Sequence, residues 1–316
     1  MIARIQQALL GAQLLISALL AAWFVHSRLL TLVPAVLLAL IIPFMVQSAL
    51  IGAECLIAWW VRDEPGLQTA STGDWVRAWW KESMAAWRTF NFAQPLLGHL
   101  PVLRPGTAHD ATAVPVLLVH GFFCNRALWR PMARALAARG HAVEAIDLEP
   151  AFGSIDAYTA QIEAAVAALK ARTGAARVAL VCHSMGGLAV RAWLRTGTRA
   201  PVCKVITLGT PHQGTVLAAL GHGRNVRQMR RHSRWLKQLA MDESALALGP
   251  HHTPEYLVIR TWQDNIVAPQ SPQTLPQATI RSFRGLGHVG LVYDQAVCNT
   301  VLQALQLPES AFRPQK

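Results

Sequence analysis

Charged side chains are scarce in this 316-residue chain, and acidic ones are the scarcer kind. Only 15% of the residues are Asp, Glu, Lys or Arg, whereas 53% are hydrophobic. Ordinary soluble proteins carry about 25% charged residues, so this composition indicates contact with a membrane. The 29 Lys and Arg residues outnumber the 17 Asp and Glu residues and give a formal net charge of +12, which suits an anionic membrane surface.

The sequence also lacks the signatures of several other protein classes. Zinc-finger spacings, a basic zipper and RNA-binding motifs are absent, so we expect no nucleic-acid partner despite the positive charge. Histidines do not occur at zinc-binding spacings, and we expect neither a metal nor a cofactor. The five cysteines show no paired spacing, which argues against a disulfide framework and agrees with a reducing compartment. There are no internal repeats or low-complexity tracts.

The apolar excess is concentrated near the N-terminus, in two uncharged runs at residues 8–25 and 29–53. Because about 20 helical residues span the hydrocarbon core of a bilayer, we expect residues 1–61 to form a transmembrane helical hairpin. A cleaved signal peptide is the alternative for the first run, although no convincing cleavage site follows it. For the second run, the alternative is a partly interfacial position.

A hairpin leaves the N-terminus and the large domain on the same side of the membrane. The loop between the two runs offers only His26 and Arg28, whereas the other side carries more cations: Arg4, Arg62, Arg77, Lys81 and Arg88. The positive-inside rule therefore favours an inner-membrane, multi-pass protein with the large domain in the cytoplasm. A periplasmic domain stays open as the alternative, and the sequence does not indicate an oligomeric state.

Residues 62–113 combine a Trp-rich helical pattern with a linker. One helical face is apolar and comprises Val76, Trp79, Trp80, Met84 and Trp87. The charged residues Arg77, Lys81, Glu82 and Arg88 fall largely off that face. Such a helix could lie in the headgroup layer or pack on the globular domain. Pro, Gly and Thr are frequent at residues 98–113, which is typical of a linker.

From residue 114 onward, β-rich runs alternate with helical patterns. We expect strands at residues 114–119, 142–146, 178–182, 202–208, 256–259 and 278–283. The helical patterns cover residues 127–139, 156–172, 185–195 and 294–305. This alternation predicts an α/β domain over residues 114–316, with a mostly parallel sheet and helices on both faces.

The segment "CHSMG" has the form of a nucleophile elbow, G-x-S-x-G, with Cys182 in place of the first glycine. The tight turn needs small residues two before and two after the serine, and Cys182 and Gly186 satisfy this. Ser184 would then present its hydroxyl at the carboxyl end of a strand. The competing interpretation is a serine that caps a buried helix, but the preceding strand and the following helix favour the elbow.

A serine nucleophile needs a base held by an acid. His183 is adjacent, but neighbours at such a turn point apart. His288 lies among glycines after the last strand, and Asp264 directly follows an apolar strand, so these two fit the order serine, acid, histidine along the chain. Alternatively, Asp264 caps a turn and His288 is a surface residue. Three other acids are poorer candidates: Asp242, Glu243 and Asp294.

Acyl transfer also needs hydrogen-bond donors for the developing oxyanion. The Met185 amide, directly after the nucleophile, is one candidate. The second is the Phe122 amide in "VHGFF", where His120 and Gly121 lead out of the first core strand and Gly121 lets the backbone turn close to the site.

Several separated motifs, in this order, resemble those of α/β-hydrolase bacterial lipases: "VHGFF", "VCHSMGG", "TLGTPHQGT", "QDNIV" and "GLGHVGLVYD". The last two resemble the small Bacillus-type lipase A group especially. The resemblance covers residues 114–305. It implies a serine carboxyl-ester hydrolase with Ser184, Asp264 and His288 as the triad and Phe122 and Met185 as oxyanion donors. The hairpin and an insertion at residues 215–252 depart from the secreted lipases.

We therefore expect a membrane-anchored lipase or esterase that acts on lipid or other acyl esters through an acyl-enzyme. An acyltransferase or thioesterase would use the same triad. A catalytically silent, membrane-anchored binding protein is a further alternative, although it would not need all five functional positions. The basic amphipathic segment within residues 215–252 is either a lid over the cleft or a surface helix packed on the sheet.

Overall fold

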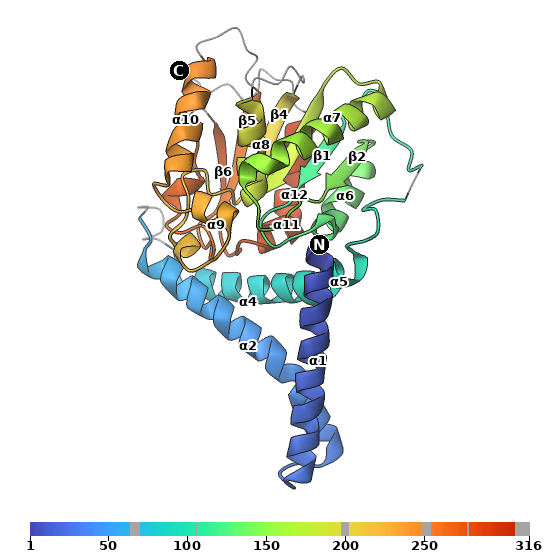
Figure 1. Ribbon diagram of the computed structural model, residues 1–316, viewed down its shortest axis with the longest axis vertical. Helices are drawn as coiled ribbons and strands as arrows, with labels where there is room; N and C mark the ends of the chain where they lie inside the picture. The colour runs from blue at the N-terminus through green and yellow to red at the C-terminus, as the bar shows by residue number, and fades with distance from the viewer. Residues whose placement is uncertain (64–69, 105, 197–201, 248–253, 277, 307–316) are drawn as a thin grey trace.

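The C-terminal domain of the computed structural model is built on six parallel strands in the order β2-β1-β3-β4-β5-β6 (Figure 1). The structure describes all residues except 64–69, 105, 197–201, 248–253, 277 and 307–316. The strands are β1 (Val116–Val119), β2 (Val143–Ile146), β3 (Val178–His183), β4 (Val202–Leu208), β5 (Glu255–Thr261) and β6 (Thr279–Phe283). Each strand overlaps one of the runs predicted from the sequence, and every strand end lies within two residues of the predicted one.

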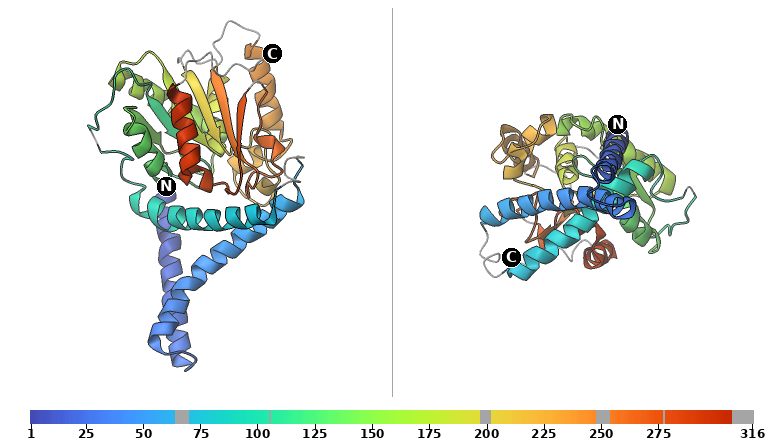
Figure 2. Two further views of the ribbon diagram at one scale, coloured as in Figure 1. Left: turned by 180° about the vertical axis from the view of Figure 1, so that it is seen from behind. Right: turned by 90° about the horizontal axis from the view of Figure 1, so that it is seen from below.

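Helices cover both faces of the sheet because the buried side chains of its strands alternate in direction. On one face, Leu118 and Val181 pack with α6 (Arg130–Ala137), α11 (Gly290–Tyr293) and α12 (Gln295–Gln306). On the other face, Leu117 and Leu180 pack with α7 (Thr159–Thr173), α8 (Met185–Leu194) and the two insertion helices, α9 (Arg224–Gln228) and α10 (Arg234–Ala247). Figure 2 shows α12 on the opposite side of the sheet from α7 and α8. The predicted α/β architecture, a parallel sheet with helices on both faces, is thereby confirmed.

Two long helices, α1 (Ile2–His26) and α2 (Leu32–Trp60), project away from the domain as a hairpin (Figures 1 and 2). Both are long and apolar enough to cross a membrane. Many of their large apolar side chains are exposed, including Leu15 and Leu37. The domain-proximal part of each helix packs on the rest of the protein, and Gln6 of α1 donates to the Phe123 carbonyl at 3.1 Å.

The Trp-rich helix α4 (Thr72–Arg88) lies across the end of the domain from which the hairpin projects (Figure 1). It begins at a capping box formed by Ser71 and Asp74. A π-helical turn (Thr89–Ala93) and the short α5 (Gln94–Leu97) follow it. The Trp79 indole donates to the Ser48 carbonyl of α2 at 2.7 Å, so α4 joins the hairpin to the domain.

The two faces of α4 have different neighbours. The face that packs on the domain consists of mostly small residues and one acid: Ala78, Glu82, Ser83, Ala85 and Ala86. The opposite side exposes Val76, Trp80 and Met84. The sequence pattern grouped Glu82 with the cations outside the Trp face, but the structure separates them, because Glu82 is buried whereas Lys81 and Arg88 are exposed.

Candidate active site

Ser184 occupies a strained turn between β3 and α8. Its backbone has φ 54° and ψ −129°, a conformation that costs a non-glycine residue about 1–3 kcal/mol and persists only where its surroundings enforce it. Cys182 and Gly186 on either side are fully buried. A Cβ atom on Gly186 would lie 2.4 Å from the Val119 carbonyl oxygen, so only glycine fits there. This local geometry is that of a nucleophile elbow.

Asp264 and His288 form a direct pair between the loops that follow β5 and β6. His288 Nδ1 lies 3.1 Å from each carboxylate oxygen of Asp264. Asp264 has no exposed surface, and its Oδ1 also accepts from the Ile266 and Val267 amides at 2.9 and 2.7 Å. These two amides fix the carboxylate, which in turn orients the imidazole with Nδ1 protonated and leaves Nε2 as the basic atom.

The charge of Asp264 also controls the protonation of His288. Burial alone would lower the pKa of this imidazole, but the Asp264 charge and its hydrogen bond, with further carboxylates nearby, hold the pKa above its ordinary value. The imidazolium form is therefore stabilised, as expected of a group that accepts a proton during a reaction.

His183 connects the serine turn to the His288 loop. The two imidazole rings lie 4.6 Å apart between centroids, and His183 Nε2 lies 3.1 Å from the His288 carbonyl oxygen. Because a carbonyl only accepts, Nε2 carries the proton. Burial, together with the charge of His288, keeps the pKa of His183 well below its ordinary value. A neutral His183 thus donates to the backbone of the His288 loop, which leaves His288 as the predicted base.

The Ser184 hydroxyl forms no hydrogen bond with any residue that the structure describes. Ser184 and His288 are nevertheless both nearly buried and lie on adjoining loops. A nucleophile–base hydrogen bond is often long before substrate binds and tightens only in the complex. The structure thus brings Asp264 and His288 into contact. It joins the Ser184 turn to the His288 loop through His183, without a formed Ser–His bond.

The loop after β1 approaches the same serine. A Cβ atom on Gly121 would lie 2.6 Å from the Ser184 Cβ, which explains why the backbone here needs glycine. His120 Nε2 accepts from the Leu148 amide at 3.1 Å, so its Nδ1 is protonated and donates to the Gly121 carbonyl at 2.8 Å. Burial lowers the pKa of His120 and keeps it neutral. His120 thereby fixes the loop that carries the Phe122 amide.

The two predicted oxyanion donors are the amides of Phe122, in the loop after β1, and of Met185, directly after the serine. Within the part of the chain that the structure describes, neither the Phe122 amide nor the Met185 amide donates to a hydrogen bond. Met185 is the first residue of α8, and the N–H groups at a helix N-terminus have no partner within the helix. Both amides are thus available as donors, although their role stays a prediction.

The acids that the sequence ranked lower form ion pairs elsewhere. Asp242 and Glu243 on α10 lie 3.2 Å from Arg195 and 2.6 Å from Arg191, respectively. Asp294 lies 3.4 Å from Lys81. None of the three contacts His288 in the described structure.

The insertion at residues 215–252 packs on the domain through apolar side chains. Val226, Met229, Leu236 and Leu239 are buried in the core on the α8 side of the sheet. The Trp235 indole donates to Asp156 at 2.9 Å. Residues 248–253 lie outside the described structure. The contacts describe a helix pair held against the domain, and movement as a lid stays a prediction.

Sequence reasoning missed several polar residues around His288. Glu82 accepts from the Val289 and Gly290 amides, and Asn265 accepts from the His288 amide at 3.0 Å. Asn265 also donates to Glu54 of α2 at 2.7 Å. The only sequence signal for Glu82 is that it stands among small residues at helical spacing, a pattern typical of a closely packed helix face.

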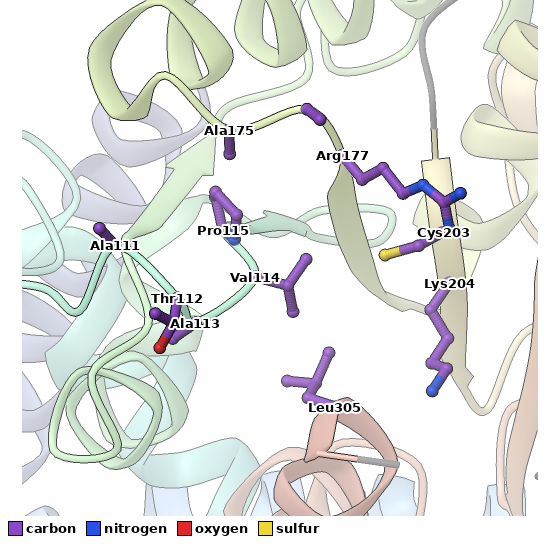
Figure 3. A pocket seen from close by; sticks show the side chains of 11 residues that line it. Ala111, Thr112, Ala113, Val114, Pro115, Ala175, Arg177, Cys203, Lys204 and Leu305 are labelled. Atoms are coloured by element: carbon purple, nitrogen blue, oxygen red, sulfur yellow. The ribbon is translucent and has the colours of Figure 1, made fainter. Parts of the chain in front are cut away.

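A pocket lies at the end of the sheet opposite to Ser184, Asp264 and His288. It has a volume of about 420 Å³ and is lined by residues at the amino ends of β1, β3 and β4, among them Pro115, Arg177 and Lys204 (Figure 3). Ligands of open α/β sheets bind outside the carboxyl ends of the strands. This pocket contains none of the predicted site residues.

Comparison with known proteins identifies the family of this chain and relatives of part of it. The alpha/beta hydrolase family matches residues 116–304. A triacylglycerol lipase of Burkholderia plantarii is 34% identical over 127 residues, which cover 37% of this chain and 35% of that protein. A triacylglycerol lipase of Pseudarthrobacter phenanthrenivorans is 36% identical over 119 residues, which cover 35% and 37% of the respective chains. The chain thus spans little more than a third of each curated relative.

Solved structures share the fold. The mature form of a Bacillus licheniformis lipase superposes with a TM-score of 0.54 at 20% identity, over 66% of this chain and all of that one. Aspergillus fumigatus lipase B gives a TM-score of 0.52 at 17% identity, over 67% and 60% of the two chains. From the family match and the parallel sheet that carries the elbow, we conclude that this chain belongs to the alpha/beta hydrolase family.

Proposed function

We propose that the protein is a membrane-anchored serine hydrolase that cleaves carboxylic esters. The observation that carries this proposal is the Asp264–His288 pair beside a serine on a strained strand-to-helix turn. This is the arrangement that activates a hydroxyl for attack on an acyl carbon. The triacylglycerol lipases among the relatives support an ester as the substrate.

The mechanism follows from the positions of these groups. His288 Nε2 takes the Ser184 proton as the hydroxyl attacks the acyl carbonyl, while the Phe122 and Met185 amides donate to the oxyanion. The imidazolium, stabilised by Asp264, then protonates the leaving alcohol. Water activated by the same imidazole attacks the acyl-enzyme and releases the carboxylic acid.

An aromatic cluster beside the oxyanion loop favours an apolar acyl group. The Phe122 and Phe152 rings lie 5.7 Å apart between centroids, and Phe123 lies 6.4 Å from Phe152. Phe152 is partly exposed. Aromatic side chains offer a large apolar surface, which suits the acyl chain of a lipid ester.

The test is hydrolysis of p-nitrophenyl esters by the purified full-length protein, combined with a fluorophosphonate probe. We expect covalent labelling and a preference for longer acyl chains over acetate. Adding acceptor alcohols distinguishes hydrolysis from acyl transfer, because a transferase yields new ester in preference to free acid. Absence of both labelling and turnover would instead support a binding protein that only retains the fold.

The proposed membrane anchor consists of α1 and α2. Their 25 and 29 residues correspond to lengths of about 37 and 43 Å at the α-helical rise, more than the roughly 30 Å of a hydrocarbon core. The exposed Val76, Trp80 and Met84 of α4 lie on the side of that helix away from the domain core. We propose that this stripe rests in the interfacial layer, and that the net positive charge favours anionic lipid.

Extraction of membranes from expressing cells tests the anchor. We expect the protein to stay in the membrane pellet in alkaline carbonate and to dissolve only in detergent, because two apolar helices are held by the bilayer core. Release by carbonate, or a mature N-terminus located after α1, would contradict the two-helix anchor. A known peripheral protein of the same membrane serves as the control for the extraction.

A further inference from the structure

A buried carboxylate from α4 holds the loop that carries His288. Glu82 is only 2% exposed. Its Oε1 accepts from the Val289 amide at 2.9 Å, and its Oε2 accepts from the Gly290 amide at 2.8 Å. On the other side of His288, a Cβ atom on Gly287 would lie 2.6 Å from the Glu82 Cβ. Glu82 therefore contacts the chain both before and after the histidine.

A second contact reaches the same loop from α2. The His288 amide donates to Asn265 Oδ1 at 3.0 Å, and Asn265 Nδ2 donates to Glu54 at 2.7 Å. Glu54 lies on α2 and Glu82 on α4, and these two helices pack on each other through Trp79. The backbone of the His288 loop is thus held directly by Glu82, from outside the catalytic domain, and by Asn265, which in turn contacts Glu54.

Burying a carboxylate costs more free energy than burying a neutral side chain. Burial raises the pKa of Glu82 to about 7, despite the two backbone hydrogen bonds that lower it. Burying an ionised group destabilises the fold unless it is well paired. A carboxylate, however, accepts from two N–H groups at once and brings a negative charge close to the imidazole, which a neutral side chain of the same size cannot do.

We propose that Glu82 is a positioning residue for the hydrolase, which sets the place of the His288 loop and stabilises the imidazolium by its charge. This inference rests on the proposed role of His288 as the base. It makes the packing of α4 on the domain part of the active site. The charged and titratable groups that face His288 are Asp264 from the loop after β5, Glu54 from α2, Glu82 from α4 and His183 from β3.

The Glu82→Gln variant tests both parts of the proposal. Its amide places an N–H donor against one loop amide, so we expect the loop to move. Because a misplacement of about 1 Å can reduce a rate by roughly 100-fold, we expect kcat to fall by about tenfold to 100-fold. KM should change little, since Glu82 lies behind the histidine loop.

The pH dependence of kcat/KM distinguishes a role of the Glu82 charge from a role of Glu82 in packing alone. The acid limb of kcat/KM reports protonation of the essential base in the free enzyme. In its ionised form Glu82 raises the pKa of His288. Because its own pKa is about 7, removal of this carboxylate should lower the His288 pKa and move the acid limb to lower pH only to the extent that Glu82 is ionised there. Glu82→Asp keeps the charge but shortens the reach. It should lower kcat and leave the limb closer to that of the wild type.

Lys81→Gln is the matched control, because Lys81 neighbours Glu82 on α4 but pairs at the surface with Asp294. It should match the wild type in kcat and pH profile. Fluorophosphonate labelling to completion counts active sites in each sample, so that loss of folded protein is not scored as loss of rate. An unchanged per-site rate and acid limb in Glu82→Gln would overturn the proposal.

If Glu82→Gln does not fold, the Gly287→Ala variant tests the inference instead. This variant keeps the Glu82 carboxylate, but its new Cβ atom pushes the His288 loop and α4 apart. A wild-type per-site kcat in this variant would overturn the inference. Wild-type protein that neither labels nor hydrolyses esters would overturn the proposed function and this inference together. If the wild type is labelled and active, but Glu82→Gln has the same per-site rate and acid limb, this inference alone is overturned.

Discussion

Replacing Ser184 with alanine is expected to reduce ester hydrolysis by about 10⁴- to 10⁶-fold, because the acyl group then has no nucleophile to accept it. Fluorophosphonate labelling should disappear completely. The oxyanion donors and the substrate contacts remain, so a residual rate above that of water is expected. The measurement is kcat/KM for a p-nitrophenyl ester, together with a labelling time course.

The fold should survive this substitution. Ser184 is held at φ 54° by its neighbours, and an alanine there has the same backbone strain as the serine. The melting temperature should therefore change little. Ser244→Ala provides the matched control, because Ser244 is exposed on α10 and its hydroxyl donates only to the Ala240 carbonyl. Turnover or labelling by Ser184→Ala near the wild-type level would show that another residue is the nucleophile.

Replacing Asp264 with asparagine is expected to lower kcat by about 10⁴-fold, the size of effect that the loss of a triad carboxylate produces in a serine protease. The Ile266 and Val267 amides donate to Oδ1, so the asparagine oxygen will face them and its NH₂ group will face His288. The imidazole then accepts at Nδ1 and carries its proton on Nε2. In that tautomer it cannot take the serine proton.

Asp294→Asn is the control for this variant. Asp294 also carries a carboxylate after the last strand, but it accepts from the Ala296 and Val297 amides at the start of α12, a role that asparagine fills equally well. The double variant Ser184→Ala with Asp264→Asn should be no slower than Ser184→Ala alone, because the triad acts as a unit. A full rate in Asp264→Asn would remove Asp264 from the mechanism.

Much of the fold could be predicted from local pattern. Strand β4 has the predicted bounds, Val202–Leu208, and α8 begins at Met185 directly after the serine as expected. Both follow from short-range signals, an apolar β-rich run and a strand-to-helix turn with a small residue on each side. Asp264 and His288 were placed by their order along the chain. The structure gives their contact distance, and their catalytic roles stay predictions until the variants are measured.

The surroundings of His288 could not be predicted in this way. Glu82 lies more than two hundred residues from Val289 and Gly290, and nothing in its own helix specifies that those amides are its partners. The hydropathy pattern assigned it to a polar face. The structure buries that face because Ala78, Ala85 and Ala86 let α4 approach the domain closely.

The sequence by itself determined the alternating α/β order, the turn at Ser184 and the two apolar N-terminal helices, because each depends on residues close together in the chain. Only the tertiary structure decided which carboxylates stand behind the imidazole and which face of α4 is buried. Those outcomes depend on packing between distant segments, where close approach of small side chains and the pairing of buried N–H groups outweigh the polarity of any single residue.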